Sequence, residues 1–232
     1  MAKKKKLPQR YKSYLKDSLT KKMYKNVIEE YTSIAKVYDD KWGKYLASTE
    51  EALLEQLKLK GKETILDAGC GTGSLLIAIQ KKFKHKGKIL GFDITPAMLE
   101  LAEFNLSKGK FNKSLQLELA HCENFSAKDN SIDIIIFSSV LHHLPHPESA
   151  LTEFHRVLKK NGRLLLVDYC TDYPSTKLFD YFARLFHKAH HKAYSSEYVK
   201  ELLISHKFKV SAFKTWKATA FRGVMLFEAR NK

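Results

Sequence analysis

The sequence predicts an α/β fold, in which a seven-stranded, mostly parallel sheet carries helices on both faces and ends in an antiparallel C-terminal hairpin edge. Two observations lead to this prediction. Between residues 63 and 169, short apolar runs alternate with helical patterns, and strands separated by helices pair in parallel through right-handed crossovers. Residues 208–216 and 221–230 then form two strand-like runs joined by a short connection, which is typical of a hairpin.

The order of the elements follows from the spacing of apolar residues. Residues 11–58 predict helices, because apolar side chains recur there at helical spacing, and Ser48 or Thr49 followed by acidic residues is typical of a helix start. We expect a basic and flexible N-terminal arm over residues 1–26, and one folded domain over residues 27–232. The expected strands are residues 64–69, 88–94, 115–120, 131–139, 163–169, 208–216 and 221–230. The expected helices are residues 73–83, 96–107, 147–160, 176–193 and 196–206.

Three glycines stand at alternate positions where the first expected strand passes into a helix, in the stretch "DAGCGTG". Glycine allows positive φ angles and lets a ligand come close to the main chain. The N–H groups at the start of the next helix favour an anionic group, and ligands of open α/β sheets bind beyond the carboxyl ends of the strands. Gly69, Gly71 and Gly73 therefore predict a site for a small molecule with a carboxylate or phosphate. The alternative is a purely structural turn.

Two carboxylates mark the ends of the first two strands. Asp67 precedes the glycines, and Asp93 ends the second strand in "LGFDITP". The first can meet a ligand ammonium, and the second can accept hydrogen bonds from ribose hydroxyls, although it can also cap the helix that begins near Pro96. S-adenosylmethionine carries an amine, a carboxylate and a ribose, and so fits both acids. Residue 74 is serine, so the GxGxxG pattern of dinucleotide-binding dehydrogenases is absent.

Four characteristic sequence motifs follow one another at compatible spacings: "LDAGCGTG", "GFDITPAML", "DNSIDIIIFSSVLHHL" and "EFHRVLKKNGRLLLVD". Through them, residues 31–169 resemble a class I S-adenosylmethionine-dependent methyltransferase with a Rossmann-like fold, and are similar to the ubiquinone and menaquinone C-methyltransferases. The resemblance implies S-adenosylmethionine as the cofactor and a small-molecule methyl acceptor. It does not select the acceptor, because relatives of this family methylate many compounds.

The resemblance also implies which residues contact the cofactor. The expected contacts are Tyr38, Asp67, Gly69, Cys70, Gly71, Gly73, Asp93, Ile94, Met98, His121, Cys122, Glu123 and Ser138. The chain departs from the family at His121-Cys122, where Asp-Ala is usual, so His121 or a backbone group must replace a carboxylate at the adenine amine. It also has Asn161-Gly162 in place of a glycine pair before the fifth strand, and asparagine tolerates the left-handed conformation of that turn.

His142 and His143 follow the fourth strand, close to the place that the resemblance implies for the transferable methyl group. We name both as candidate catalytic residues. A neutral imidazole can take a proton from an acidic O–H, N–H or C–H group as the methyl arrives, or it can orient the substrate. In the alternative interpretation, one histidine packs against the sheet and the other faces solvent or the cofactor.

The helix expected over residues 176–193 lies where this family often covers its substrate, so we expect a helical lid at about residues 172–206. Its aromatic residues either line an apolar pocket or belong to the core, and periodicity cannot separate these two interpretations. They are Phe179, Tyr181, Phe182 and Phe186. His187, His190 and His191 have the spacing of one helical face, but we assign no metal site, because no acidic or cysteine partner stands close in sequence.

The charge of the chain is uneven. The formal net charge is +16, and residues 1–26 contribute +9 of it, from nine lysines and Arg10 against Asp17. Such an arm can contact an anionic membrane surface or nucleic acid, or it can stay solvated. Three scattered cysteines fit a reducing compartment, and neither a transmembrane segment nor a secretory signal is recognised. We therefore expect a cytoplasmic protein.

The leading functional hypothesis is methyl transfer from S-adenosylmethionine to a small, partly apolar acceptor. A quinone precursor, a phenol or an amine-bearing lipid would fit this description. One alternative is an RNA or protein methyltransferase that uses the basic arm for docking. Another is a nonenzymatic protein that binds S-adenosylmethionine. The sequence leaves the acceptor atom and the oligomeric state open.

Overall fold

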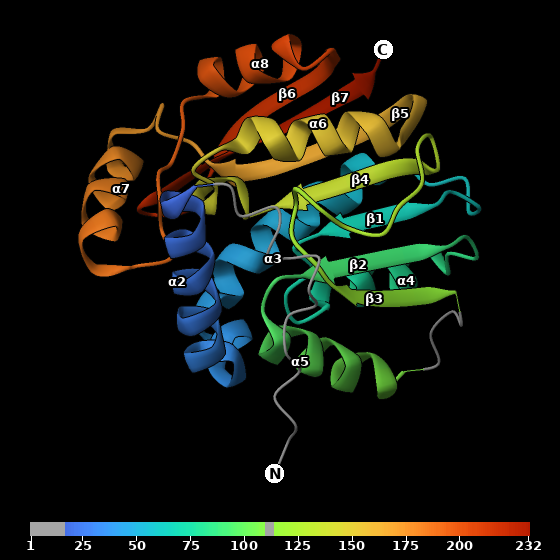
Figure 1. Ribbon diagram of the computed structural model, residues 1–232, viewed down its shortest axis with the longest axis horizontal. Helices are drawn as coiled ribbons and strands as arrows, with labels where there is room; N and C mark the ends of the chain where they lie inside the picture. The colour runs from blue at the N-terminus through green and yellow to red at the C-terminus, as the bar shows by residue number, and fades with distance from the viewer. Residues whose placement is uncertain (1–16, 110–113) are drawn as a thin grey trace.

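The computed structural model describes residues 17–109 and 114–232, and it contains the expected seven-stranded sheet (Figure 1). The strand order is β3-β2-β1-β4-β5-β7-β6. Strands β1 to β5 pair in parallel, whereas β7 runs antiparallel to both β5 and β6. The strands are β1 (Ile65–Ala68), β2 (Ile89–Asp93), β3 (Leu115–Leu119), β4 (Ile132–Ser138), β5 (Leu158–Tyr169), β6 (Phe208–Thr219) and β7 (Arg222–Asn231). This confirms the predicted parallel sheet with an antiparallel C-terminal hairpin edge.

Helices cover both faces of the sheet, because successive residues of a strand point to opposite sides. On one face, Ile134 and Ile136 of β4 belong to a core cluster with side chains of α3 and α4. On the other face, Ile135 and Phe137 belong to a cluster with side chains of α6 and α8. The helices are α2 (Ser18–Ile34), α3 (Tyr38–Leu57), α4 (Ser74–Phe83), α5 (Pro96–Ser107), α6 (Pro147–Val157), α7 (Pro174–Phe186) and α8 (Ser196–Ser205), with short 3-10 turns η1 (Ala35–Val37) and η2 (Leu141–His143).

The order of the strands creates a crevice at the end of β1. From β1 the chain continues through β2 and β3 on one side of the sheet, and later strands lie on the other side, beside β4. Connections leave this switch point in opposite directions, so a space opens beyond the carboxyl ends of the strands. Gly69, which follows β1, has φ +85°, and an added Cβ there would lie 2.4 Å from a methyl group of Val140. The turn therefore requires glycine at this position.

Two helices end earlier than the sequence predicts. Helix α6 ends at Val157 rather than at residue 160, because Leu158 already pairs with Ile132 in the sheet. Helix α7 ends at Phe186, and the expected continuation to residue 193 is wrong. The N–H groups of His191 and Lys192 donate to the carbonyl of His142, at 2.9 and 3.0 Å. Tertiary hydrogen bonds thus replace the helical ones in this segment.

The first helix among the described residues is α2, which begins at Ser18, so residue 26, the expected end of the basic arm, lies inside this helix. The side chain of Asp17 caps this helix by accepting a hydrogen bond from the N–H of Thr20 at 2.9 Å. Met23 and Tyr24 are buried in the domain. The first sixteen residues of the expected arm lie outside the described residues. No helix in residues 17–109 and 114–232 has the length and apolarity needed to cross a bilayer.

Candidate active site

A cavity of about 990 Å³, counted to its open mouth, lies beyond the ends of β1, β2 and β4. Most of the expected cofactor contacts line it, namely Tyr38, Asp67, Gly69, Cys70, Gly71, Asp93, Ile94, Met98, His121, Cys122 and Ser138. Gly73 and Glu123 do not line this cavity. Gly73 instead faces α5, where an added Cβ would lie 3.2 Å from that of Ala102.

The glycine-rich turn is fixed by hydrogen bonds within the protein. The N–H groups of Gly69 and Cys70 both donate to the carbonyl of Phe92, at 2.8 and 2.9 Å. The N–H of Gly71 donates to Oδ2 of Asp93 at 2.9 Å. These bonds join the first turn to the end of β2. The N–H groups that have no intrahelical partner are those of the first turn of α4, which begins at Ser74.

Asp67 is a buried carboxyl group that lines the cavity. Only 2% of the residue is exposed, and its carboxylate accepts no hydrogen bond from any described residue. Burial, assisted by the negative charges of Glu50 and Asp93, raises the pKa of Asp67 to about 8. A cation placed in the cavity would stabilise the ionised form. The ammonium group of S-adenosylmethionine therefore fits this position.

Asp93 is held in place at the end of β2. Its Oδ1 accepts the N–H of Thr95 at 2.8 Å, in addition to the Gly71 N–H on Oδ2. Burial raises the pKa of Asp93, and the backbone hydrogen bonds oppose this shift. Each carboxylate oxygen has a further lone pair, so Asp93 can also accept hydrogen bonds from ribose hydroxyls. The residues present therefore fit the cofactor.

His121 stands where the family usually has an acidic residue. Its ring packs against that of Tyr24, with 5.3 Å between the ring centroids. Burial lowers the pKa of His121 to about 4, so the ring is neutral near pH 7. The carboxylate that the resemblance implies at this position is thus replaced by an uncharged ring.

A second cavity, of about 470 Å³, adjoins the first. The two cavities share Tyr31, Tyr38, Ser139 and His143. The remaining wall is rich in aromatic rings and histidines. It consists of Glu30, Trp42, Tyr45, His142, Tyr169, Phe179, Ala183, His187, Ala189 and His190. A flat, partly apolar molecule would fit such a wall.

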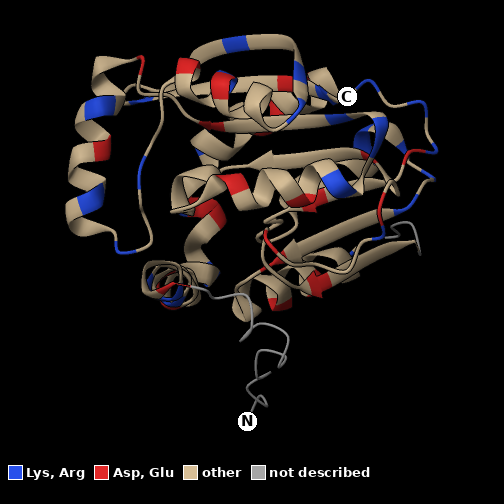
Figure 2. Cartoon of the chain, turned by 45° about the horizontal axis from the view of Figure 1, so that its top comes forward, with Lys and Arg blue, Asp and Glu red and all other residues tan. Residues whose placement is uncertain are grey.

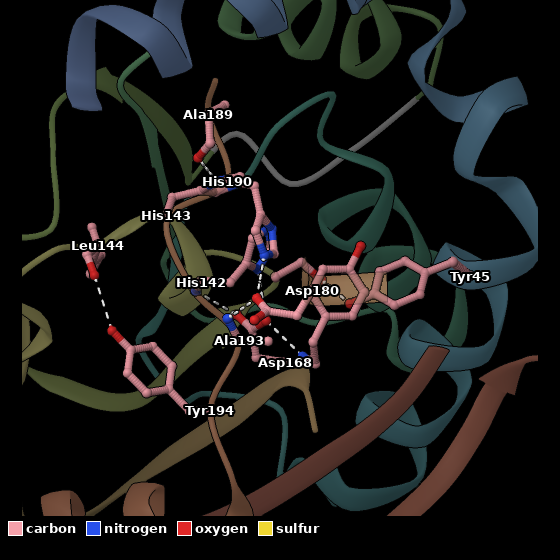
Figure 3. A network of polar contacts seen from close by, with 12 residues as sticks. Tyr45, His142, His143, Leu144, Asp168, Asp180, Ala189, His190, Ala193 and Tyr194 are labelled. Carbon is pink, nitrogen blue, oxygen red and sulfur yellow. Dashed lines mark hydrogen bonds and ion pairs between the residues drawn. The ribbon is translucent and has the colours of Figure 1, made fainter. Parts of the chain in front are cut away.

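His142 belongs to a buried polar network beside the second cavity (Figure 3). Its Nδ1 lies 2.7 Å from Oδ1 of Asp168, and the same oxygen accepts the N–H of Tyr169 at 2.6 Å. A carboxylate can only accept these bonds, so Nδ1 carries the proton and Nε2 keeps its lone pair. Burial and the neighbouring His190 hold the pKa of His142 well below its usual range. Burial raises the pKa of Asp168 to about 6.

Both ring nitrogens of His143 form hydrogen bonds. Nδ1 lies 2.6 Å from the carbonyl oxygen of Ala189, which can only accept, so Nδ1 donates there. Nε2 lies 2.8 Å from the hydroxyl of Tyr31, which donates to it. Burial keeps the pKa of His143 well below the ordinary value. The two candidate catalytic histidines therefore differ, because Nε2 of His142 has no hydrogen bond from any described residue.

The three histidines of the C-terminal segment do not share one helical face, because α7 ends before them. Nε2 of His190 lies 2.8 Å from Oδ1 of Asp180, and Nδ1 of His187 lies 3.1 Å from Oε1 of Glu30. Figure 3 shows the pair of His190 and Asp180 close to that of His142 and Asp168. Among the described residues, no group of three or more metal-binding side chains comes together.

The aromatic residues of α7 divide between its two sides. Phe179 lines the second cavity, as one of the two interpretations expects. Tyr181, Phe182 and Phe186 are 56%, 48% and 75% exposed, so they belong neither to a pocket nor to the core.

Sequence reasoning missed several residues of the two cavities. Asp168 had a usable signal, because it ends the apolar run "RLLLVDY" just as Asp67 and Asp93 end theirs. Tyr31 and Glu50 had none, because their helices reach the cavities only through tertiary packing.

Comparison with known proteins shows the family of the chain. A family profile described as a methyltransferase domain matches residues 59–217. The chain is similar to a demethylmenaquinone methyltransferase of Lactobacillus johnsonii, with 30% identity over 187 residues, which cover 74% of this chain and 76% of the relative. It is also similar to a ubiquinone/menaquinone biosynthesis C-methyltransferase of a Geobacter species, with 29% identity over 126 residues, covering 54% of this chain and 53% of that one.

A solved structure has the same fold. A SAM-dependent methyltransferase of Methanosarcina mazei superposes with a TM-score of 0.63 at 19% identity, over 77% of this chain and 96% of that chain. The cofactor of the family, S-adenosylmethionine, is the molecule that the acidic residues of the first cavity fit. The chain therefore belongs to the methyltransferase-domain family and is a class I S-adenosylmethionine-dependent methyltransferase.

Proposed function

We propose that this methyltransferase acts on a small, partly apolar acceptor bound in the second cavity, such as a quinone precursor, a phenol or an amine-bearing lipid. The shared wall of the two cavities, formed by Tyr31, Tyr38, Ser139 and His143, supports this proposal most directly. Cofactor and acceptor can meet there while each keeps its own binding surface. The names of the two curated relatives make a quinone precursor the first acceptor to test.

In this proposal the first cavity binds the cofactor through its ammonium group and its ribose hydroxyls. S-adenosylmethionine supplies an electrophilic methyl group on a positively charged sulfur. We assign Asp67 to the ammonium group and Asp93 to the ribose hydroxyls. The other expected contacts that line this cavity, such as Tyr38, Met98 and Ser138, would form the rest of the cofactor site. Placing the reacting groups side by side and excluding water supplies much of the rate enhancement for such a transfer.

We assign removal of the acceptor's proton to His142. Asp168 holds the Nδ1 proton, so the basic lone pair is at Nε2. When the acceptor atom bonds to the methyl carbon, the bond between that carbon and sulfur would break and S-adenosylhomocysteine would leave as a neutral thioether. The proton of the acceptor would pass to Nε2 of His142. Asp168 is then a positioning residue that also stabilises the resulting imidazolium. His143 has a different role, which is to hold the Tyr31 hydroxyl in the shared wall.

The proposed setting is the cytoplasm. The three cysteines support it, because all of them are buried and unpaired in the structure.

Methyl transfer tests the proposal directly. The full-length protein is incubated with S-adenosylmethionine carrying an isotopically labelled methyl group, and with a panel that includes a short-chain demethylated quinol, a catechol, an aminophospholipid and transfer RNA. We expect label in a small acceptor, with one S-adenosylhomocysteine formed for each methyl group. Asp93→Ala should weaken calorimetric cofactor binding sharply, whereas Asp129→Ala, at an exposed ion pair with Arg156, should not. Label found only in RNA, or unchanged affinity in Asp93→Ala, would contradict the proposal.

A further inference from the structure

Helix α7 carries a continuous apolar stripe on its outer surface. The stripe consists of Leu178, Tyr181, Phe182, Leu185 and Phe186, which are between 48% and 75% exposed. Their i, i+3, i+4, i+7, i+8 spacing places them along one face of the helix. The opposite face is also used, because Phe179 and Ala183 line the second cavity. Soluble monomers seldom expose five large apolar side chains side by side without a partner for them.

The exposed charges on α7 and on the segment that follows it, up to residue 192, are positive, whereas exposed Asp172 precedes the helix. Lys177 and Arg184 lie on the helix, and Lys188 and Lys192 follow it; all four are exposed. The only acidic residue between positions 174 and 192 is Asp180, which is buried and paired with His190 and Arg184. Figure 2 shows α7 at the edge of the molecule, with its basic positions spaced along the helix.

The neighbouring helix α2 adds exposed lysines beside the end of α7, together with exposed Glu29 and half-buried Glu30. The amide of Asn26 donates to the carbonyl of Lys188 at 3.0 Å, which places α2 beside the end of α7. Lys22, one helical turn before Asn26, is exposed. Figure 1 shows the two helices next to each other at one side of the sheet.

We propose that α7 docks on the surface of an anionic lipid bilayer, with its apolar stripe in the interface and the surrounding lysines and Arg184 at the lipid phosphates. An amphipathic helix with aromatic residues on one face and cations beside them lies in the plane of such a surface. The charges disfavour a second copy of this chain as the partner. In a two-fold interface the stripe would meet itself, and the four cations would lie near their own counterparts, with Asp172 as the one exposed carboxylate among residues 172–192.

This inference deepens the proposed function and rests on it in one respect. Because the inner face of α7 lines the second cavity, the acceptor would reach that cavity from the bilayer. Its chemical class would then be an amphiphile with an apolar chain that resides in the membrane and a methylatable head group.

Vesicle flotation with the full-length protein tests the docking surface. The probes are vesicles of phosphatidylcholine alone and vesicles that also contain phosphatidylglycerol. We expect binding to the anionic vesicles, and a decrease in partitioning of at least about tenfold for the double variant Phe182→Ser/Phe186→Ser. Phe104→Ser is the matched control, because Phe104 is 57% exposed on α5, away from the stripe. It should bind as the wild type does.

Two further measurements separate the stripe from simple attraction of basic residues. At about 1 M salt, purely electrostatic binding is screened, whereas the part due to the stripe should persist and remain sensitive to the double variant. In Phe186→Trp, tryptophan emission should shift to shorter wavelength when anionic vesicles are added. Phe104→Trp should show no such shift.

The outcomes distinguish docking from the methyl-transfer proposal. The same variants should keep methyl transfer to a water-soluble, short-chain acceptor within about twofold, since none of the changed residues lines a cavity. Docking is overturned if the double variant binds vesicles as tightly as the wild type. It is also overturned if the wild type forms a dimer that the double variant dissociates. Vesicle binding without methyl transfer to any small acceptor would instead count against the proposed function.

Discussion

At the scale of single residues, the first cavity depends on carboxyl groups that burial keeps from ionising freely. Asp67 is the extreme case, with a pKa raised to about 8 in the folded protein. Between the unfolded pKa near 4 and this value, the folded protein holds a proton that the unfolded chain releases. The contribution of protonated Asp67 to the stability of the folded protein is therefore fully present at low pH, and it is lost as pH rises through that range. A bound cation would restore the charge of Asp67 and lower its pKa.

Cofactor binding should consequently release a proton between about pH 6 and 8. The affinity for S-adenosylmethionine should rise with pH in this range, because the ammonium group favours ionised Asp67. Calorimetry in two buffers of different ionisation enthalpy measures the number of protons released. Asp67→Asn should weaken binding and remove most of the proton release. An identical proton release in that variant would assign the effect to another group.

The pair formed by His142 and Asp168 should set the acid limb of the pH–rate profile. A proton bound by this pair removes the lone pair at Nε2, so kcat/KM should fall as pH decreases through about 6, the pKa of Asp168. Asp168→Asn should lower kcat by roughly 100-fold and move the limb to lower pH, because an imidazolium without a carboxylate beside it loses its proton more easily.

His143→Gln provides the comparison for this pair. It should change KM more than the position of the acid limb, because His143 holds Tyr31 and has no free lone pair. Steady-state kinetics as a function of pH, for both variants, separates the two roles. An acid limb that stays in place in Asp168→Asn would rule out the pair as the titrating base.

At the scale of elements, the sequence predicts strands better than helix ends. Strands β1, β2 and β4 are compact apolar runs bounded by turn residues, and this local signal does not depend on distant parts of the chain. Strand β5, by contrast, begins at Leu158, five residues before its expected start at residue 163. The end of α7 does depend on distant parts of the chain. Helical periodicity continues through residue 193, but Glu30 of α2 accepts the N–H of Ala189, and the carbonyl of His142 accepts those of residues 191 and 192. These partners lie more than 40 positions away in the sequence.

The residues of the site also divide into those that the sequence predicts and those that it does not. Asp67 and Asp93 follow from their places at the ends of apolar runs, and Asp168 could have been found by the same rule. The sequence could not predict which way the apolar stripe on α7 faces, because both faces of this helix carry apolar residues. Periodicity shows that Phe182 and Phe186 lie together, but only the packing of α7 shows that they face outward.

The turn between β1 and α4 is an element whose glycines can be tested one at a time. Gly73 has φ +76°, and an added Cβ would lie 3.2 Å from that of Ala102. Gly73→Ala should therefore lower the free energy of unfolding by about 1–3 kcal/mol. Gly43→Ala, inside α3 with no atom within 4 Å of the added Cβ, should raise it by about 0.5–1 kcal/mol. Urea denaturation of both variants measures the two changes.

Gly73 does not line the cofactor cavity, so Gly73→Ala should act on cofactor binding only indirectly, through the packing of α4 on α5. Equal stability of the wild type and this variant would mean that the turn tolerates a side chain at positive φ, against the steric rule.

At the scale of the whole molecule, the basic N-terminal segment and the described residues of the methyl-transfer site lie in different parts of the chain. Residues 1–16 contain six lysines and Arg10 and no acidic residue, so they contribute +7 of the net charge of +16. Every described residue that lines either cavity lies at Tyr24 or beyond. The charge of the N-terminal segment and the chemistry of the site should therefore be separable by mutation.

Replacing Lys3, Lys4, Lys5 and Lys6 with serine in the full-length chain tests this separation. Methyl transfer to a small acceptor should stay within about twofold of the wild type, because no described residue of the cavity walls is altered. Binding to RNA should become less sensitive to salt, with the logarithmic slope reduced by up to about three or four if all four lysines contact phosphates. If RNA were the true acceptor, the same variant would lose methyl transfer in parallel with RNA binding. A filter-binding titration beside the methyl-transfer assay therefore tells whether the basic segment serves the reaction itself or only attracts the protein to anionic surfaces.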